Sequence, residues 1–324
     1  MHRADYVIKR LAFALMTVFV AITINFLLFR ALPGDAVADL ARAPHASPQL
    51  RAELRHEFGL DQPIWKQYVL YLDQLVFHAN MGVSFADLQP VTTELTDKLK
   101  NTIPMVMVGT LFAIGIGIVT GFLAAWRRSG VVDKVSTNAA IVFYALPTQF
   151  IGMMLILMFA AYLPTAGMRN EVENFFSHGS TWSSIKDIGL HMVLPAFTLA
   201  LTLFGEYTLI VRSSMLETLG EDYVLTARAK GLPQRRIVVS HALRNAMLPI
   251  VTLVALSLGF IVAGAILVEI IYSWPGIGQA IYSAVSNRDY PMLQGAFLIL
   301  TVSVVFFNFI ADLIYFKLDP RITE

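Results

Sequence analysis

The chain has 324 residues, of which 56% are hydrophobic and 15% are charged, and its formal net charge is +1. Soluble domains usually carry about 25% charged residues, so this composition indicates an integral membrane protein. The sequence contains no cysteine, which excludes disulfide bonds and thiolate metal sites. The first apolar run is too long for a cleavable signal peptide and is not followed by a small-residue cleavage site. We therefore expect it to stay in the membrane.

Six apolar runs are long enough to cross the hydrocarbon core of a bilayer, which needs about 20 residues. They lie at about 8–30, 102–126, 136–163, 190–211, 246–271 and 293–316. A lone strand in lipid would leave its backbone groups unpaired, so each run is expected to be a helix. The predicted fold class is all-α integral membrane, with six transmembrane helices.

The distribution of Lys and Arg predicts the orientation. These residues gather in the N-terminal tail, in the loop after the second span, in segment 212–245 and in the C-terminal tail. The short loops on the other side hold only Arg169, Lys186 and Arg288. The positive-inside rule therefore places both termini in the cytoplasm of a multi-pass protein of the cell inner membrane.

The chain is expected to divide into three units. Residues 1–30 form a tail and the first span, residues 31–101 an external segment, and residues 102–324 a core with spans two to six. In the external segment, Ser47-Pro48 is typical of a helix start. A second amphipathic stretch, Pro63 to Phe77, carries aromatic rings suited to a membrane–water interface. We interpret this segment as a cap on the bundle, with a docking surface for an external partner as the alternative.

The loop at 212–245 is too polar to enter the membrane. Gly220-Glu221-Asp222 indicates a helix start, because acidic residues favour the positive end of the helix dipole. Gly231, with Pro233 two residues later, indicates that this helix ends there. A second, basic amphipathic helix is expected from about Gln234 to Asn245. The loop is thus predicted to be a short helix, a tight turn and a second helix.

Basic cytoplasmic loops often contact only anionic lipid. Here, however, Ala227, Ala229 and Gly231 lie together beside the predicted turn. Small residues so arranged indicate a low-relief surface that fits a groove on another protein.

Seven short motifs then follow one another along the chain: Leu32-Pro33-Gly34-Asp35, Asp222-Tyr223-Val224, Thr226 to Gly231, His241 to Asn245, Trp274 to Gly278, Arg288-Asp289-Tyr290-Pro291, and Leu318-Asp319-Pro320-Arg321. In this order they resemble the peptide-permease branch of ABC-importer permeases, from Arg10 to Arg321. The polar loop is similar to the coupling loop of that family, also called the EAA loop.

Two departures from the general coupling-loop pattern are present. The leading Glu–Ala pair of the family falls at Leu225 and Thr226, so only Ala227 and Gly231 match. The stretch from Gly231 to Leu248-Pro249 is also longer than in the general pattern. The peptide branch shares both features, so they favour this branch.

The resemblance implies a type I importer-like fold and a set of partners. The sequence lacks the phosphate-binding motif G-x-x-x-x-G-K-[ST], so ATP and Mg are expected at two separate cytoplasmic ATPase subunits. The other expected partners are a second homologous permease chain, an external substrate-binding protein and membrane lipid. The second permease chain is expected to form a heterodimer with this one. We expect no catalytic residue, resident cofactor, metal site or nucleic-acid partner in this chain.

The resemblance also implies where the ATPase contacts the chain and what is carried. The expected coupling residues are Glu221, Asp222, Tyr223, Ala227, Arg228, Ala229, Lys230 and Gly231. The expected cargo is di- or oligopeptides. Nickel chelates, glutathione and short oligosaccharides are alternatives within the same importer class.

Several polar or aromatic residues at or near membrane depth are further candidates. Glu206, near the middle of the fourth span, either lines the pore and meets a peptide amino terminus or stabilises the bundle. Trp274, Asp289 and Tyr290 lie in a turn-rich outer segment that either forms an external gate or binding-protein contact or caps the bundle. Glu269 is interpreted as an anchor of a helix end, with gating as the weaker alternative.

Other polar residues in the spans are expected to be structural. His191, alone at the start of the fourth span, is not expected to bind a metal. Asp312 is expected to pair with Lys317 or Arg321. The spacing Gly117-x-x-x-Gly121 in the second span predicts close helix packing, either within the chain or against a partner permease.

Two other classes of membrane protein are disfavoured. An ion-coupled secondary transporter typically has inverted repeats and discontinuous helices, and no convincing internal repeat is visible. A membrane enzyme needs converging acidic, histidine or nucleophilic side chains. Only Glu206 is expected deep in a span, so neither class fits well.

Overall fold

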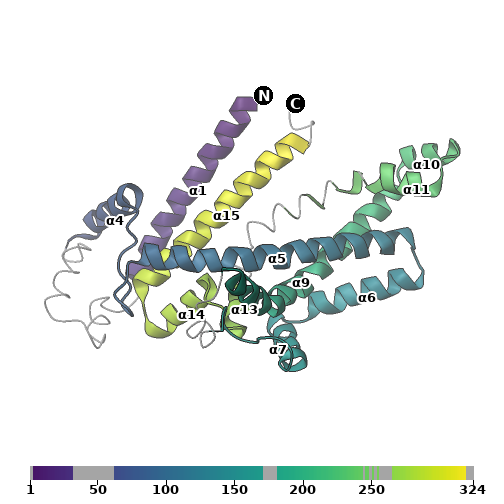
Figure 1. The fold of residues 1–324 in the computed structure, drawn as a ribbon. Helices are drawn as coiled ribbons and strands as arrows, with labels where there is room; N and C mark the ends of the chain where they lie inside the picture. Colours follow the sequence, from purple (N-terminus) through teal and green to yellow (C-terminus); the bar gives the residue numbers. More distant parts are fainter. Residues whose placement is uncertain are drawn as a thin grey trace.

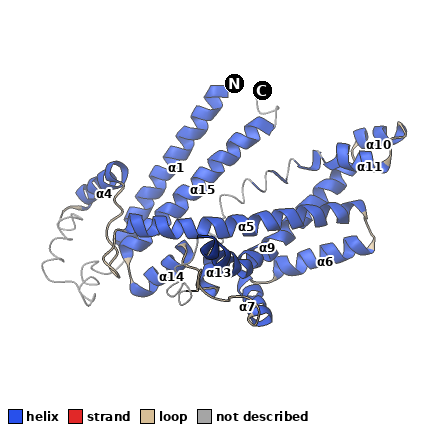
Figure 2. Cartoon of the chain, viewed as in Figure 1, coloured by secondary structure: helices blue, strands red, loops and turns tan. Residues whose placement is uncertain are grey.

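The computed structural model describes residues 3–31, 62–170, 181–243 and 265–318, with 245–247, 250–251 and 254. The predicted helix that begins at Ser47-Pro48 and most of the predicted span 246–271 lie outside the described residues. The described part of the chain is helical (Figure 2), apart from turns and one isolated bridge between Val83 and Pro90. The helices are α1 Arg3–Ala31, α4 Ile64–His78, α5 Val91–Trp126, α6 Val131–Ala145, α7 Thr148–Phe159, α9 Thr181–Leu219, α10 Asp222–Ala229, α11 Gln234–Arg236, the π-helical segment η1 Ile237–Ala242, α13 Ile266–Ile271, α14 Ile277–Asn287 and α15 Tyr290–Leu318.

Four described helices, α1, α5, α9 and α15, are long and apolar enough to span a membrane, and the bent pair α6–α7 makes a fifth if it counts as one span. They correspond to the predicted spans one, two, four, six and three. The predicted fifth span is described only near its ends, where α13 covers its last six residues.

The third span was predicted as one helix, 136–163, and this is wrong. The chain bends by 106° between α6 and α7. Pro147 lies at the bend, and its missing N–H and its ring prevent the helix from continuing. The preceding residue, Leu146, adopts an extended conformation (φ −75°, ψ 136°), as residues before proline usually do.

Helices α5 and α9 extend well beyond the spans predicted from hydropathy. The second span was expected to start at residue 102, but α5 starts at Val91, inside the predicted external segment 31–101. The fourth span was expected to end at residue 211, but α9 continues to Leu219, inside the predicted loop 212–245. Hydropathy detects only the part of a helix that is apolar, whereas polar residues continue the same helix outside the lipid.

Two pairs of helices organise the fold (Figure 1): α1 lies along α15, and α5 lies along α9. Gly117 and Gly121 allow the second pair to approach closely. A Cβ atom at Gly117 would overlap Tyr207, and one at Gly121 would overlap the backbone of Thr208. The small-residue spacing in the second span therefore serves packing within this chain.

Polar contacts hold α1 to α15 near both ends. The Asn25 side chain donates a hydrogen bond to the carbonyl of Gln294 (2.9 Å). Arg10 pairs with Asp312 at 3.2 Å. The prediction that Asp312 takes part in a structural ion pair is thus confirmed, but its partner is Arg10 on the neighbouring helix.

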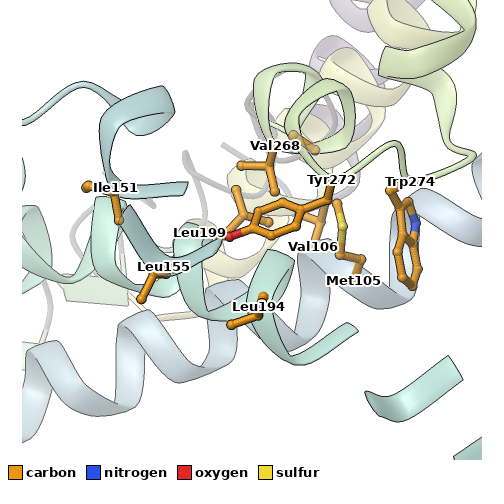
Figure 3. Close-up of a cluster of buried hydrophobic side chains, with 10 residues drawn as sticks. Met105, Val106, Ile151, Leu155, Leu194, Leu199, Val268, Tyr272 and Trp274 are labelled. Atoms are coloured by element: carbon orange, nitrogen blue, oxygen red, sulfur yellow. The ribbon is translucent and has the colours of Figure 1, made fainter. Parts of the chain in front are cut away.

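A second core joins α5, α7, α9 and α13, and Figure 3 shows most of its side chains. Met105 and Val106 come from α5, and Leu194 and Leu199 from α9. At its centre, the Tyr272 hydroxyl lies 2.9 Å from that of Thr198 and donates to the carbonyl of Gly152 (3.2 Å). Because the contact to Gly152 is made by α7, this core fixes α7 after the bend at Pro147.

Candidate functional site

Helix α10 is a short helix with one buried face and one exposed face. Val224 and Ala227 pack with Ile237 of η1 in a small apolar cluster. The opposite face carries Leu225 and Ala229, both exposed. Leu225 is 51% exposed although it is apolar. This face is therefore free to meet another molecule.

The end of α10 is fixed by its backbone. Gly231 has a φ of +72°, a conformation that glycine adopts without steric cost. The N–H of Gly231 bonds to the carbonyl of Arg228, and the N–H of Leu232 bonds to that of Ala227. This hydrogen-bond pattern is a Schellman motif, and Leu232 adds the apolar contact that usually accompanies it. The predicted stop at Gly231 is confirmed.

The segment after α10 links it to the long helices. We call Asp222–Ala242, which comprises α10, α11 and η1, the α10–η1 hairpin. Asn245 donates a hydrogen bond to the Tyr223 hydroxyl (2.7 Å), and Ser214 of α9 donates to the carbonyl of Ala246 (3.0 Å). A buried cluster then joins the ends of α5 and α9 to η1 and the residues after it: Ala125, Val211, Met215, Val238, Ala242, Ala246 and Ile250. A displacement of α10 would therefore reach α5 and α9 through η1.

A buried ion pair fixes α6 to α9 near the same end of α5. The Arg212 guanidinium donates to both carboxylate oxygens of Asp133, at 2.6 and 3.1 Å. The Ser129 N–H and the Thr137 hydroxyl also donate to this carboxylate. The side chain of Asp133 is only 6% exposed, so the four hydrogen bonds replace the water that this charge would otherwise hold.

At the other end of α5, Trp274 is part of the core rather than the surface. Its side chain is fully buried in the cluster of Figure 3. The indole N–H donates to the carbonyl of Asn101 (3.0 Å), and the Asn101 side chain donates to that of Pro275 (2.9 Å). Trp274 is therefore not exposed to a binding protein in this structure, and its role as an external gate stays a prediction.

Glu269 holds the turn between α13 and α14 against α5. Its carboxylate, fully buried, accepts hydrogen bonds from the Thr102 hydroxyl (2.7 Å) and from the backbone N–H of Gly278 (2.6 Å), at the start of α14. A Cβ atom at Gly276 would overlap the carboxylate, which explains the glycine there. The interpretation of Glu269 as an anchor of a helix end is confirmed.

Asp289 plays a similar part beyond the other end of α14. It is 1% exposed and accepts hydrogen bonds from the Ser84 hydroxyl (2.5 Å) and from the backbone of Phe85 and Met292. It thus joins the loop before α5 to the start of α15. A carboxylate so occupied is not available to a binding protein, whereas the neighbouring Tyr290 is partly exposed.

Two family matches cover almost the whole chain. Residues 117–324 match the family described as binding-protein-dependent transport system inner membrane component. Residues 3–106 match the N-terminal domain described for such membrane components. The chain belongs to this family of permease components.

Relatives agree with this assignment, and one solved structure has a similar fold. The permease is 36% identical to the dipeptide transport system permease protein DppB of Escherichia coli K12, with 98% of each chain covered. It is 35% identical to the di/tripeptide permease DppB of Pseudomonas aeruginosa UCBPP-PA14 and 32% identical to the glutathione permease GsiC of Escherichia coli K12, both over 98% of each chain. Its fold resembles an inward-facing structure of the MetNI methionine ABC transporter (TM-score 0.55, 17% identity), which covers 69% of this chain and 96% of that one.

Membership of the family shows what the permease does not do. It is the membrane component of an ABC importer and not an enzyme, because ATP hydrolysis belongs to a separate subunit. We therefore interpret the contacts of α10, Asp133, Glu269 and Asp289 as serving binding, packing and movement rather than catalysis.

The predicted coupling residues fall into two groups in the permease. Ala227 is buried in the hairpin's own cluster and so does not contribute to an outward surface. The other seven are exposed, as follows: Glu221, Asp222, Tyr223, Arg228, Ala229, Lys230 and Gly231. Sequence reasoning overlooked Leu225, although Val224 and Ala227 at i and i+3 already indicate an inner face that leaves Leu225 outside.

Glu206 and His191 lie on α9. Glu206 is partly buried and forms no hydrogen bond or ion pair with another residue of the described segments, so its pore-lining role stays a prediction. His191 is buried, and its Nδ1 lies 2.9 Å from the carbonyl oxygen of Asp187. The expectation of a structural histidine is confirmed.

Proposed function

We propose that the permease is the channel-forming subunit of an ATP-driven importer of di- or oligopeptides, and that α10 is the element through which an ATPase subunit acts on it. The observation that carries this proposal is the construction of α10. The helix is fixed on one side by Val224 and Ala227 and presents Leu225 and Ala229 on the other. A contact helix needs this combination of a rigid base and a free, low-relief face.

The proposed mechanism is alternating access. Closure of the ATPase pair on ATP moves α10 as a rigid body, and η1 passes the movement to the ends of α5 and α9 through their shared cluster. The spans then exchange an inward-open for an outward-open packing. The Asp133–Arg212 pair makes α6 move with α9.

The proposed assembly contains one copy of this chain, a second homologous permease chain, two ATPase subunits and an external substrate-binding protein. Both termini and α10 lie in the cytoplasm, as the positive-inside rule predicts. ATP and Mg bind at the ATPase subunits. The family description, which names a binding-protein-dependent system, supports the outer partner.

The proposed cargo follows the relatives. Two that are 35–36% identical over 98% of the chain are named for dipeptides or for di- and tripeptides, and a third, 32% identical, for glutathione. All three cargoes are short peptides or a peptide-like thiol. Glu206, on α9, is the proposed contact for the amino terminus of the cargo.

Co-purification tests the assembly. The tagged chain is extracted from its own cells in mild detergent, and the proteins that stay bound are identified by mass. Two ATPase subunits and a second permease of similar length support the proposal. A chain that transports when purified alone contradicts it.

Uptake by reconstituted vesicles tests the cargo. The purified assembly and its binding protein are presented with a labelled dipeptide, a tripeptide, glutathione, a nickel chelate and a short oligosaccharide, each with and without ATP inside. We expect ATP-dependent uptake of the peptides. Any uptake of glutathione should be reduced when the peptides are present, because they compete for the same pathway. In Glu206→Gln, unchanged affinity and rate would remove Glu206 from the pathway but leave the importer function standing.

A further inference from the structure

Helix α4 exposes an apolar stripe on one flank. Trp65, Val69 and Val76 are 69%, 56% and 61% exposed, and with Leu72 they recur at i, i+4, i+7 and i+11, which places them in one line along a helix. The adjacent flank is exposed; it carries Lys66 and Asp73 and, at its C-terminal end, Phe77, which is 79% exposed. The helix thus has an apolar flank and a polar ridge beside the face that packs on the protein.

The contacts between α4 and α1 set the depth of this stripe. The Tyr68 hydroxyl lies 2.6 Å from that of Thr23. The Phe26 ring lies 5.2 Å from that of Tyr68 and 5.5 Å from that of Tyr71. Thr23 precedes the end of α1 by eight residues, about 12 Å along the helix axis. Helix α4 therefore lies beside the membrane-spanning part of α1 and not beyond its end (Figure 1).

At this level α1 itself presents an apolar surface. Ile24, Leu27 and Leu28 are 57%, 53% and 52% exposed, and only 17% of the most apolar stretch of α1 is buried. The stripe of α4 thus continues the exposed apolar surface of a spanning helix. A soluble binding protein does not reach this depth, which favours lipid as the occupant.

We propose that α4 lies in the interface of the bilayer, in the leaflet where α1 ends, with Trp65, Val69, Leu72 and Val76 against lipid acyl chains and the Lys66–Asp73 ridge toward water. Interfacial amphipathic helices place their apolar face about 5–10 Å below the headgroup boundary, and Thr23, about 12 Å from the end of α1, lies close to this range. In the proposed orientation this is the outer leaflet. The inference requires that α1 spans the membrane and depends neither on the cargo nor on the coupling mechanism.

Nitroxide labels test this placement directly, and the chain contains no cysteine of its own to remove. Val69→Cys and Val76→Cys report on the stripe, and Asp73→Cys, one turn from Val69, is the matched control on the polar ridge. Ile24→Cys on α1 supplies the lipid reference. Each variant is labelled in the full assembly in nanodiscs, with the assembly containing the unmutated chain as background. Collision with oxygen, which concentrates in lipid, and with a water-soluble nickel chelate is then measured.

We expect the labels at residues 69 and 76 to shift toward oxygen and away from nickel, to the same extent as the label at residue 24, while the label at residue 73 shifts toward nickel. Nickel contact at residues 69 and 76 equal to that at residue 73 would place α4 in water and overturn the proposal. Protection from both reagents would mean that a protein covers the stripe, and would also overturn it. All four positions are exposed, and transport by each variant, measured in parallel, reports separately on the importer function.

Discussion

The two ends of α5 carry opposite kinds of structure. Near Thr102, the buried carboxylate of Glu269 fixes the α13–α14 corner, and the conspicuous residue Trp274 is fully enclosed. Near Ala125, about 35 Å away along the axis, the α10–η1 hairpin stands on a small cluster and leaves Leu225 and Ala229 exposed. Both regions are prominent in the sequence, yet one is built for rigidity and the other for contact. A distinctive motif therefore indicates that a region matters, but it does not tell whether the region provides rigidity or a contact surface.

The largest loss of stability is expected on removal of the Trp274 side chain. We expect Trp274→Ala to lower the stability of the permease by about 3–5 kcal/mol, because it leaves a cavity in the core. Melting in detergent measures this. Tyr282→Ala changes a side chain of α14 that is 54% exposed. Its free energy of unfolding should lie within about 0.5 kcal/mol of that of the unmutated chain. A Trp274→Ala variant that melts normally but no longer responds to the binding protein would return Trp274 to the surface role.

The ion pair near the hairpin should give the next largest effect. Arg212→Met leaves the Asp133 carboxylate buried without its cation, and removing one partner of such a pair costs about 3–5 kcal/mol. The double variant Asp133→Leu with Arg212→Met should recover most of this loss, because no charge remains buried. Equal melting temperatures for the single and double variants would show that the pair is not the cause.

The turn after α10 should give a smaller, local effect. At Gly231 nothing obstructs a Cβ atom, but the positive φ makes an L-residue unfavourable by roughly 1–2 kcal/mol. Gly231→Ala should therefore speed hydrogen exchange in α10. Gly189→Ala is the control: space is also open there, but Gly189 lies within α9. Equal exchange in both variants would contradict a role for the turn conformation.

Much of this fold was predictable from the sequence, and the failures have physical causes. Hydropathy located α1, α5, α9 and α15 because lipid requires about 20 apolar residues for each. Hydropathy missed the polar extensions of these helices, such as Val91 to Asn101, because they lie outside the apolar part that crosses the membrane. The bend in the third span has a visible signal in the sequence, Pro147, because proline interrupts the hydrogen bonding of a helix.

The candidate site was predictable only in part. The turn at Gly231 follows from local chemistry, so it was predicted correctly. The burial of Trp274 depends on a partner far along the chain, Asn101, whereas the i, i+3 spacing of Val224 and Ala227 already indicates the buried face of α10. A local pattern of residue types cannot identify so distant a partner, so the sequence alone left a surface role and a packing role for Trp274 both open, and the structure shows that it is buried.

The smallest expected change in stability accompanies the largest change in function. The central claim is that the exposed face of α10 receives the movement of an ATPase subunit. Ala229→Arg adds a long charged side chain to this face without touching the cluster of Val224 and Ala227. The free energy of unfolding should therefore change by less than about 0.5 kcal/mol. Ala227→Arg is the comparison, because it disrupts the cluster itself.

The decisive measurement is ATP-driven uptake and substrate-stimulated ATP hydrolysis by the reconstituted assembly that carries Ala229→Arg. We predict that uptake is lost and that hydrolysis no longer responds to the loaded binding protein, while the variant inserts and melts like the unmutated chain. Normal uptake with normally stimulated hydrolysis would contradict the assignment of α10 as the coupling element.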